Sequence, residues 1–293
     1  MKIAIYGQAI QEEDLIYLKD LLEELHQIES TIFFEKKFAK EISKHFRGMD
    51  YGTFTQDNGL NASFDIFVSF GGDGTMLRAV TYIKDLGIPI VGVNTGRLGF
   101  LSTFKKEDVR KVVSEFVAGR YTVEERTLLE VELNEDIDEI GDMNFALNEI
   151  TVSRKDTTSM ITVETYLNDE YLTSYWADGL IISTPTGSTG YSLSCGGPVI
   201  APNARALVLT PIAPHNLNAR PLVIDDGTQI RLKVSGREHT HLVSLDSRIA
   251  NIPNGKEIKV KKSDFTIKMI EYKSESFLKT LRNKLLWGED KRN

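Results

Sequence analysis

The stretch Ile66-Phe67-Val68-Ser69-Phe70-Gly71-Gly72-Asp73-Gly74-Thr75 joins an apolar run to three glycines and one aspartate, and a helical pattern follows it. We predict a buried strand that ends at the glycines and a helix that begins there. Glycine lets the backbone turn sharply and approach a ligand closely, and the free N–H groups at a helix start favour an anion. The stretch therefore predicts a phosphate-binding loop in which Asp73 accepts a proton from an attacking hydroxyl.

A simpler interpretation treats the same residues as a turn after a strand, with Asp73 capping the helix. Such a turn needs one or two glycines, whereas this loop has three around its aspartate, so we favour the ligand-binding interpretation. The chain has neither a Gly-x-x-x-x-Gly-Lys-Ser/Thr loop nor a Gly-x-Gly-x-x-Gly motif after its first strand. These absences exclude a P-loop nucleotide hydrolase and a standard dinucleotide fingerprint.

Residues 1–126 alternate between strand and helix patterns, which is typical of a parallel sheet covered by helices. The expected strands are residues 3–6, 31–34, 65–70 and 88–93, and the expected helices are residues 12–28, 37–46, 75–86 and 107–118. From residue 127 to 270 the pattern changes to short alternating segments rich in Thr, Val, Ile and Tyr, with a hairpin turn at Asn168-Asp169. We therefore predict an α/β plus all-β fold: an N-terminal Rossmann-like α/β domain and a C-terminal antiparallel β domain. Residues 274–287 return to helical spacing, and residues 271–293 are expected to rejoin the first domain.

The composition is that of an ordinary globular protein of 293 residues, with 41% hydrophobic and 26% charged residues. A net charge of −7 argues against non-specific nucleic-acid binding, which relies on a basic surface. The single cysteine, Cys195, permits no intramolecular disulfide. No segment approaches the roughly 20 apolar residues of a membrane span, and no signal peptide is recognised at the N-terminus. We expect a cytoplasmic protein that binds no membrane.

Three further segments carry polar side chains where a ligand could use them. Residues 94–100 follow a predicted strand at the end where open α/β sheets bind ligands, and Arg97 could reach an anion there; an ordinary exposed loop is the alternative. Asn148-Glu149 interrupts an apolar strand pattern, so one of the two needs a polar partner such as a ribose or an amide, unless the strand is at an edge or bulged. Residues 178–198 open from a strand into hydroxyls and glycines that suit phosphate or sugar, with Tyr191 able to stack on a base.

The five histidines and the cysteine show no metal-ligand spacing. His239 and His241 alternate along a predicted strand, and we interpret both as surface residues.

Four blocks of the sequence are similar to those of the NAD kinases, which phosphorylate the 2′-hydroxyl of the adenosine ribose of NAD with ATP. The blocks are residues 71–75, 94–100, 148–149 and 178–198, and they occur in the family's order. Gly-Gly-Asp-Gly alone is shared with lipid kinases and phosphofructokinases, whereas the block 178–198 is particular to NAD kinases. The resemblance covers roughly residues 1–270.

The resemblance implies an active site between the two domains, with Asp73 as proton acceptor, Gly74 beside the dinucleotide and Arg78 near a ligand phosphate. The other positions that it assigns to NAD binding are Asn148, Glu149, Asp178, Thr186, Thr189, Gly190, Tyr191, Ser192, Leu193, Ser194 and Ala213. It also implies NAD and ATP as substrates, Mg²⁺ or another divalent ion bound with ATP, and a homodimer or homotetramer.

The chain departs from the family pattern at three positions. Gly190 stands where alanine is usual, Trp176 where some relatives carry a basic residue, and Ser247 where relatives often have Gln or His, so the last two are left out of the predicted site. Two other functions stay open: a lipid kinase that shares the Gly-Gly-Asp-Gly loop, and a dinucleotide sensor without turnover. The polar residues 178–194 speak against the first, and the intact Asp73 speaks against the second.

Overall fold

The computed structural model describes residues 1–97, 99–102, 104–133, 140–156, 159–272 and 276–286. The chain forms two compact units, one of Met1–Glu125 with Ile267–Asn293 and one of Arg126–Thr266. The chain passes between the units twice, within β7 (Tyr121–Leu133) and within β18 (Glu257–Tyr272). The boundaries predicted from the sequence were after residues 126 and 270.

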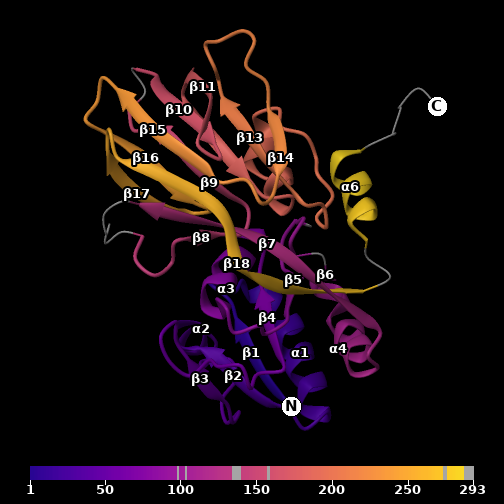
Figure 1. The fold of residues 1–293 in the computed structure, drawn as a ribbon. Coiled ribbons are helices and arrows are strands. Elements are labelled where there is room, and N and C mark those ends of the chain that lie inside the picture. Colours follow the sequence, from indigo (N-terminus) through magenta and orange to yellow (C-terminus); the bar gives the residue numbers. More distant parts are fainter. Residues whose placement is uncertain (98, 103, 134–139, 157–158, 273–275, 287–293) are drawn as a thin grey trace, which may run out of the picture. The chain divides into compact units, whose positions relative to one another are not determined.

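The first unit contains a parallel sheet whose strands follow the order β3-β2-β1-β4-β5 (Figure 1). The strands are β1 (Lys2–Tyr6), β2 (Thr31–Glu35), β3 (Gly52–Phe54), β4 (Ile66–Phe70) and β5 (Ile90–Asn94). Two further partners, β6 (Phe104–Lys105) and the end of β18, pair with β5 in the parallel sense. The predicted α/β fold is confirmed. The strand order reverses at β1, which has β2 on one side and β4 on the other. The crevice outside the carboxyl ends of such strands is the usual ligand site of open α/β sheets.

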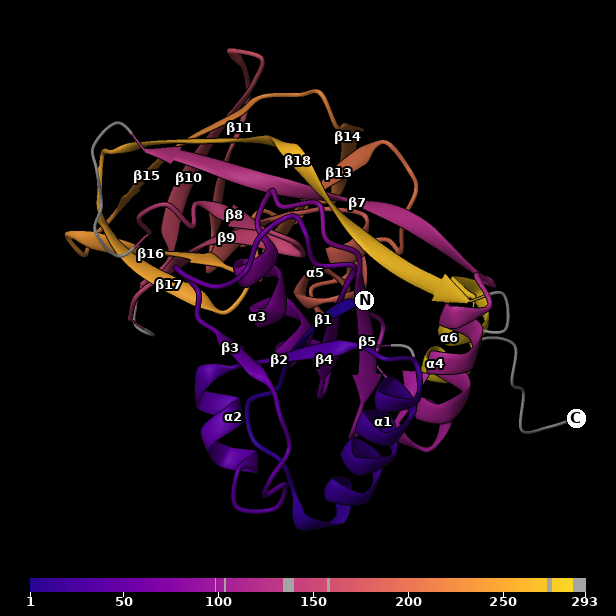
Figure 2. The same ribbon diagram turned by 90° about the horizontal axis from the view of Figure 1, so that it is seen from below.

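Helices cover both faces of this sheet. α1 (Leu15–Gln27), α2 (Lys36–Ile42) and α4 (Val109–Val117) share one hydrophobic core with the side chains of Ile66, Val68 and Phe70 in β4. The intervening Phe67 points the other way and belongs to an aromatic cluster with Tyr6, Phe54 and Tyr82 of α3 (Asp73–Ile83). Figure 2 shows α3 across the strands from α1 and α2. β4 is buried on both faces, which explains its continuous apolar run.

The described helices are mostly shorter than the sequence pattern suggested. α3 begins two residues earlier than predicted, at Asp73, because Gly72 takes the extended N-cap position. β3 and β6 were not expected, since three and two residues are too short for a periodic signal. The last helix, α6 (Phe277–Leu285), has Ser276 as its N-cap, and the Ser276 hydroxyl accepts a hydrogen bond from the Lys279 amide at 3.2 Å. No helix among the described residues is both long and apolar enough to cross a membrane.

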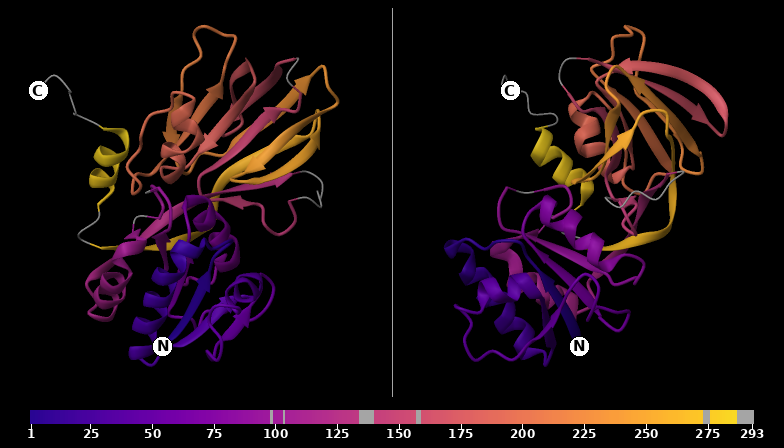
Figure 3. Two further views of the ribbon diagram at one scale, coloured as in Figure 1. Left: turned by 180° about the vertical axis from the view of Figure 1, so that it is seen from behind. Right: turned by 90° about the vertical axis from the view of Figure 1, so that its left-hand side faces the viewer.

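The second unit is built from two antiparallel groups of strands around one apolar core, drawn pink to orange in Figure 3. One group has the order β14-β13-β12-β9-β16-β17, and the other joins β11, β10, β15 and β18. The strands not yet given are β8 (Phe145–Ala146), β9 (Glu149–Arg154), β10 (Ile161–Leu167), β11 (Glu170–Ala177), β12 (Gly179–Ser183), β13 (Ala206–Ile212), β14 (Leu222–Asp225), β15 (Ile230–Gly236), β16 (Thr240–Leu245) and β17 (Arg248–Pro253). The predicted antiparallel β fold is thereby confirmed.

The predicted hairpin turn at Asn168-Asp169 is confirmed, whereas the predicted surface position of His241 is wrong. Asn168 and Asp169 both have positive φ, 49° and 66°, and join β10 to β11 as the predicted hairpin. His239 is exposed, but the surface interpretation of His241 is wrong, because this side chain is fully buried. Its Nδ1 lies 2.9 Å from Asn254 Oδ1, and burial lowers the pKa of the imidazole. His239 precedes β16 (Thr240–Leu245) and does not belong to it, so the period-2 pattern predicted for both histidines applies only to His241.

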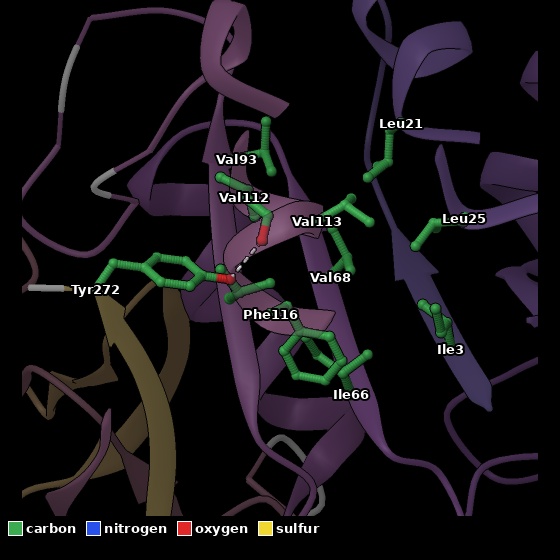
Figure 4. Close-up of a pocket in the computed structure, with 11 residues that line it drawn as sticks. Ile3, Leu21, Leu25, Ile66, Val68, Val93, Val112, Val113, Phe116 and Tyr272 are labelled. Atoms are coloured by element: carbon green, nitrogen blue, oxygen red, sulfur yellow. Dashed lines mark hydrogen bonds between the residues drawn. The ribbon is translucent and has the colours of Figure 1, made fainter. Parts of the chain in front are cut away.

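A small apolar cavity of about 20 Å³ lies beneath α1 and α4 in the first unit. Figure 4 shows Leu21 and Leu25 of α1, Val112 and Val113 of α4, and Tyr272 at the end of β18 around it. The Tyr272 hydroxyl donates a hydrogen bond of 2.9 Å to the Val112 carbonyl, so the end of β18 is tied to α4. Burial raises the pKa of this tyrosine. The apolar lining offers a water molecule no hydrogen-bond partner, and apolar cavities are typically empty.

Replacing Val68, which lines the cavity, with Ile is expected to stabilise the protein. The added methylene fills apolar space, which contributes about 0.8 kcal/mol, or roughly 2 °C in Tm for a chain of this size. Thermal denaturation followed by circular dichroism measures the change. Val80→Ile is the matched control, since Val80 is equally buried but does not line the cavity, and overpacking there lowers stability. Equal losses of Tm in both variants would contradict the expectation.

Candidate active site

The loop between β4 and α3 turns at Gly71, in a backbone conformation that favours glycine. Gly71 has φ +153°, and a Cβ on it would lie 2.3 Å from the Thr75 hydroxyl. Its amide donates to the Val93 carbonyl at 2.9 Å, which fixes the loop to β5. Nothing lies within 4 Å of the Cβ positions of Gly72 and Gly74, so packing does not explain these two glycines. The N-cap Gly72 offers no side chain to the helix start, where the first N–H groups lack intrahelical partners.

Asp73 does not cap the helix; its carboxylate reaches across to a neighbouring loop. Phe100 donates its amide to Oδ2 at 2.7 Å, and Leu101 and Ser102 donate theirs to Oδ1 at 3.1 and 2.9 Å. Among the described residues, these amides fill three of the roughly four acceptor positions of a carboxylate, and the fourth lies on Oδ2. The carboxylate is therefore rigidly oriented with one position left for a donor such as a hydroxyl.

The loop after β5 is shaped to make these contacts. Asn94 braces it by donating from Nδ2 to the carbonyls of Arg97 and Ser102 at 3.0 and 3.2 Å and by accepting the Gly96 amide at 2.8 Å. Gly99 lies so close to Asp73 that a Cβ would come within 1.6 Å of Oδ1. The block 94–100 thus serves Asp73 directly, and Gly99 is required by close approach rather than by a turn.

Arg78 lies one and a half turns into α3 and is exposed. With the Gln8 amide oriented to satisfy its hydrogen bonds, the guanidinium donates from Nη1 and Nε to the Gln8 oxygen at 2.7 and 2.8 Å. Gln8 follows β1, the strand next to β4 in the sheet. Arg78 is therefore anchored at the carboxyl end of the strands and keeps further N–H groups for an anion.

In the second unit, Asn148 and Glu149 lie where β8 ends and β9 begins. The backbone amides of Leu147, Asn148 and Glu149 donate to the carboxylate of Asp246 at 2.9, 2.8 and 3.2 Å. Asn148 Oδ1 and Glu149 Oε2 are both buried without a hydrogen-bond partner among the described residues. Buried polar atoms are seldom left unpaired, so a ligand that supplies donors is the expected partner.

Burial raises the pKa of two neighbouring carboxyl groups, those of Glu149 and Asp246. Burial, and next the negative charge of Asp246, raise the pKa of Glu149 to about 8, while a hydrogen bond from the Tyr191 amide acts in the opposite sense. Burial also raises the pKa of Asp246, but three amides and the Arg248 charge oppose that rise. Because Asp246 has more donors, Glu149 is the group that holds the proton near neutral pH. A protonated carboxyl can both donate to and accept from a ligand.

The segment 184–197 packs directly on this pair. It contains a 3₁₀ turn, η3 (Thr186–Thr189), and the short helix α5 (Tyr191–Ser194). A Cβ on Gly187 would lie 2.0 Å from the Asn148 carbonyl oxygen, and one on Gly190 would lie 3.0 Å from Glu149 Oε2. The Thr186 hydroxyl is a further buried oxygen without a partner among the described residues. The segment therefore adds an unpaired hydroxyl and two close-fitting glycines to the same place.

The other predicted residues of this segment differ in accessibility. Tyr191 is 46% exposed and its ring is free to meet a ligand, and Ser194 is also exposed. Thr189 donates its hydroxyl to the Thr186 carbonyl at 3.2 Å, and Leu193 is half-buried. Ser192 is fully buried, and its hydroxyl lies 2.8 Å from that of Thr210. The Ser192 side chain therefore makes its hydrogen bond inside the protein core.

Asp178 and Ala213 lie next to each other in the fold, where β12 begins and β13 ends. Arg154 Nη2 is 2.9 Å from Asp178 Oδ2, and the Asp178 amide donates to the Ile212 carbonyl at 3.0 Å, one residue before Ala213. The charge of Asp178 acts on Tyr191, which places the two side chains near each other. Ala213 has φ +43°, a conformation that turns the chain after β13. Trp176, 45% exposed, packs its ring on His215 at 4.3 Å, so it makes an aromatic contact where some relatives have a charge.

Two groups of predicted residues are thus each brought together: Asp73, Gly74 and Arg78 in the first unit, and Asn148, Glu149, Asp178 and the segment 186–194 in the second. Sequence reasoning missed Asp246 and the amides of residues 100–102. A carboxylate that begins a two-residue turn after an alternating strand, as Asp246 does, is the signal that was available. Among the described residues, no group of three or more His, Cys, Asp or Glu side chains is placed to hold a metal ion.

Comparison with known proteins gives the same class of protein along nearly the whole chain. Residues 3–121 match the ATP-NAD kinase N-terminal domain, and residues 147–272 match the ATP-NAD kinase C-terminal domain. NAD kinases of Flavobacterium psychrophilum and Cytophaga hutchinsonii are 57% and 43% identical over the full length of both chains. Both the fold and these matches define a phosphotransferase that uses a nucleotide.

Two solved structures agree with this class. A yeast NADH kinase complexed with NADH has a TM-score of 0.86 and 26% identity, covering 99% of this chain and 89% of its own. An NAD kinase from Archaeoglobus fulgidus in complex with ATP has a TM-score of 0.74 and 26% identity, covering 97% of each chain. The chain belongs to the NAD kinase family, and the resemblance stated from its four sequence blocks is confirmed.

Gly99→Ala is expected to lower turnover by about 100-fold, since misplacing a reacting group by an ångström costs that much. A Cβ on residue 99 would lie 1.6 Å from Asp73 Oδ1, so either the carboxylate or the loop must move away. Steady-state formation of NADP measures the loss. Gly96→Ala in the same loop is the control, because its Cβ meets only Asn94 Oδ1 at 3.9 Å. A Gly99→Ala enzyme as active as Gly96→Ala would show that the close approach does not matter.

Proposed function

We propose that this phosphotransferase uses Asp73 as the general base when it transfers the terminal phosphoryl of ATP to the 2′-hydroxyl of the adenosine ribose of NAD. The 2′-oxygen forms a bond to the γ-phosphorus as the bond from that phosphorus to the bridging oxygen of ADP breaks. The hydroxyl proton passes to Asp73 Oδ2. The observation that carries this proposal is the orientation of the Asp73 carboxylate by three amides, with one acceptor position left on Oδ2.

The first unit is proposed to hold phosphate. Helix α3 has 11 residues, and its start has open space at Gly72 and Gly74, so its N–H groups are available to an anion. Arg78 supplies a positive charge from the second turn of the same helix, in an orientation fixed by Gln8. Amides and a guanidinium that are already in place stabilise charge on the phosphoryl group without reorganising during the transfer.

The second unit is proposed to hold the dinucleotide. The unpaired oxygens of Asn148, Glu149 and Thr186 need donors, and ribose hydroxyls and a carboxamide supply them. Glu149 in its protonated form accepts and donates without adding a negative charge beside the dinucleotide's phosphates. The exposed ring of Tyr191 offers a face on which a base can stack. Asp178, Thr189, Gly190, Leu193, Ser194 and Ala213 stay predictions as further binding residues.

A divalent ion is proposed to arrive with ATP rather than to reside in the protein. Mg²⁺ is usually bound by substrate phosphates and one or two carboxylates rather than by a cage made only of protein ligands. When bound, the ion neutralises charge on the transferred phosphoryl. Chelation by EDTA is expected to abolish NADP formation, and added Mg²⁺ is expected to restore it. Unchanged turnover in EDTA would contradict the metal requirement.

The two alternative functions are weaker than the kinase. The family matches cover residues 3–121 and 147–272 and leave no ground for a lipid kinase. A sensor without turnover needs no carboxylate fixed by three amides. A homodimer or homotetramer and a cytoplasmic location stay predictions, of which analytical ultracentrifugation tests the first and cell fractionation the second.

Asp73→Asn is expected to reduce kcat by about 10² to 10⁴, the usual contribution of a general base. The amide has nearly the same shape but cannot take the proton from the 2′-hydroxyl. Incubation with NAD and labelled ATP, followed by chromatographic detection of NADP, measures the effect, and the same assay with NADH defines the acceptor.

Asp108→Asn serves as the control, because it removes one exposed carboxylate from the first unit without touching this loop. Thermal denaturation of both variants tests whether the fold is kept. Near-normal turnover by a folded Asp73→Asn enzyme would falsify the role given to Asp73.

A further inference from the structure

Asp246 occupies the turn between β16 and β17 in a conformation that few residues adopt. Its φ is +52°, in the left-handed region where Asp and Asn are the commonest residues after glycine. From this turn its carboxylate accepts the three consecutive amides of residues 147–149, at 2.8 to 3.2 Å. The Asp246 amide in turn donates to the Glu149 carbonyl at 3.0 Å. The turn and the Asn148-Glu149 segment are therefore tied together by four hydrogen bonds.

Arg248, two residues later, secures the chain just before this segment. Its guanidinium donates to the carbonyl oxygens of Met143 and Phe145 and lies 5.3 Å from the Phe145 ring. Asp246 accepts hydrogen bonds from backbone amides and Arg248 donates hydrogen bonds to backbone carbonyls. One short turn therefore fixes the backbone from residue 143 to residue 149. Neither side chain belongs to the site predicted from the sequence.

We propose that Asp246 is a positioning residue that fixes Asn148 and Glu149 for dinucleotide binding through the three amides it accepts. This inference rests on the proposed function, since it concerns the same binding residues. Asn148 and Glu149 carry buried oxygens that have no partner among the described residues, and such atoms pair well only where their direction is fixed. Losing the Asp246 contacts leaves the segment free to turn these oxygens away from the dinucleotide.

After burial, the negative charge of Asp246 is the second cause of the raised pKa of Glu149. The groups that face Glu149 are Asp246 from the turn, and Tyr191 and Cys195 from α5. The pKa of Glu149 is raised to about 8, so the carboxyl is neutral below that pH and ionises as the pH rises through it. Ionisation places a second negative charge beside Asp246 and the dinucleotide's phosphates. The KM for NAD is therefore expected to rise above about pH 8 in the unaltered enzyme.

The test compares Asp246→Asn with the unaltered full-length enzyme, measuring kcat and KM for NAD with Mg-ATP from pH 6.5 to 9. Asparagine suits the positive φ but carries no charge and cannot accept all three amides. The KM is expected to rise about tenfold or more, the loss of one charge-assisted hydrogen bond, with a much smaller change in kcat. The pH at which KM rises is expected to move lower, because removing the Asp246 charge lets Glu149 ionise earlier.

Asp225→Asn is the matched control, since Asp225 is an exposed turn residue of the same unit that accepts one backbone amide. If the role of Asp246 is purely structural, the variant loses Tm and active enzyme, and its folded fraction keeps an unaltered KM for NAD. If Asp246→Asn does not fold, Asp246→Glu replaces it: the charge stays, the longer side chain loses the amide contacts, and KM rises with an unchanged midpoint.

A folded Asp246 variant with unaltered KM and pH profile overturns the proposal, as does a wild-type KM that stays level up to pH 9. These results differ from failure of the proposed function itself. In that case the unaltered enzyme makes no NADP, whatever residue stands at position 246.

Discussion

The constraint on which both groups of site residues depend is a carboxylate that accepts consecutive backbone amides from a distant loop. Asp73 does this for residues 100–102, and Asp246 does it for residues 147–149. A loop has many conformations of similar energy, and fixing each residue costs about 1 to 2 kcal/mol. Charge-assisted hydrogen bonds to three successive amides offset that cost. In the first case the carboxylate is itself the reacting group, and in the second it acts through the residues it holds.

The scaffold explains why these contacts fall where they do. β4 is buried on both faces, so the chain leaves the sheet at a defined point and α3 starts immediately. β5 runs alongside in parallel, and its following loop emerges at the same edge, within reach of Asp73. In the second unit, β9 pairs with β16, which brings the turn at Asp246 next to the start of β9. Sheet register therefore sets the carboxylate–amide distances in both units.

The sequence was sufficient for features that depend on neighbouring residues. The run before Gly71 predicted β4, and the glycines around Asp73 predicted a loop at a helix start, because both patterns are local. The polar pair Asn148-Glu149 was singled out because it broke an apolar pattern. The partners of these residues were not predictable, since Asp246 lies 97 to 99 residues from the amides it accepts. The same limit applies to His241, whose burial is decided by strands that the local pattern does not reveal. The helix-capping interpretation of Asp73 also fails for this reason: its amide donors lie in another loop.

The chain passes between its two units twice, and this limits how the protein can be divided. The sheet of the first unit ends with β18, and Tyr272 at its end bonds to Val112 of α4. A fragment that stops at residue 125 would lack this tyrosine and expose the apolar wall it covers. Although residues 3–121 match a family domain of their own, the compact first unit also includes the end of β18, which completes its core. A truncation of this enzyme that keeps only residues 1–125 removes Ile270 and Tyr272 from the core of the first unit.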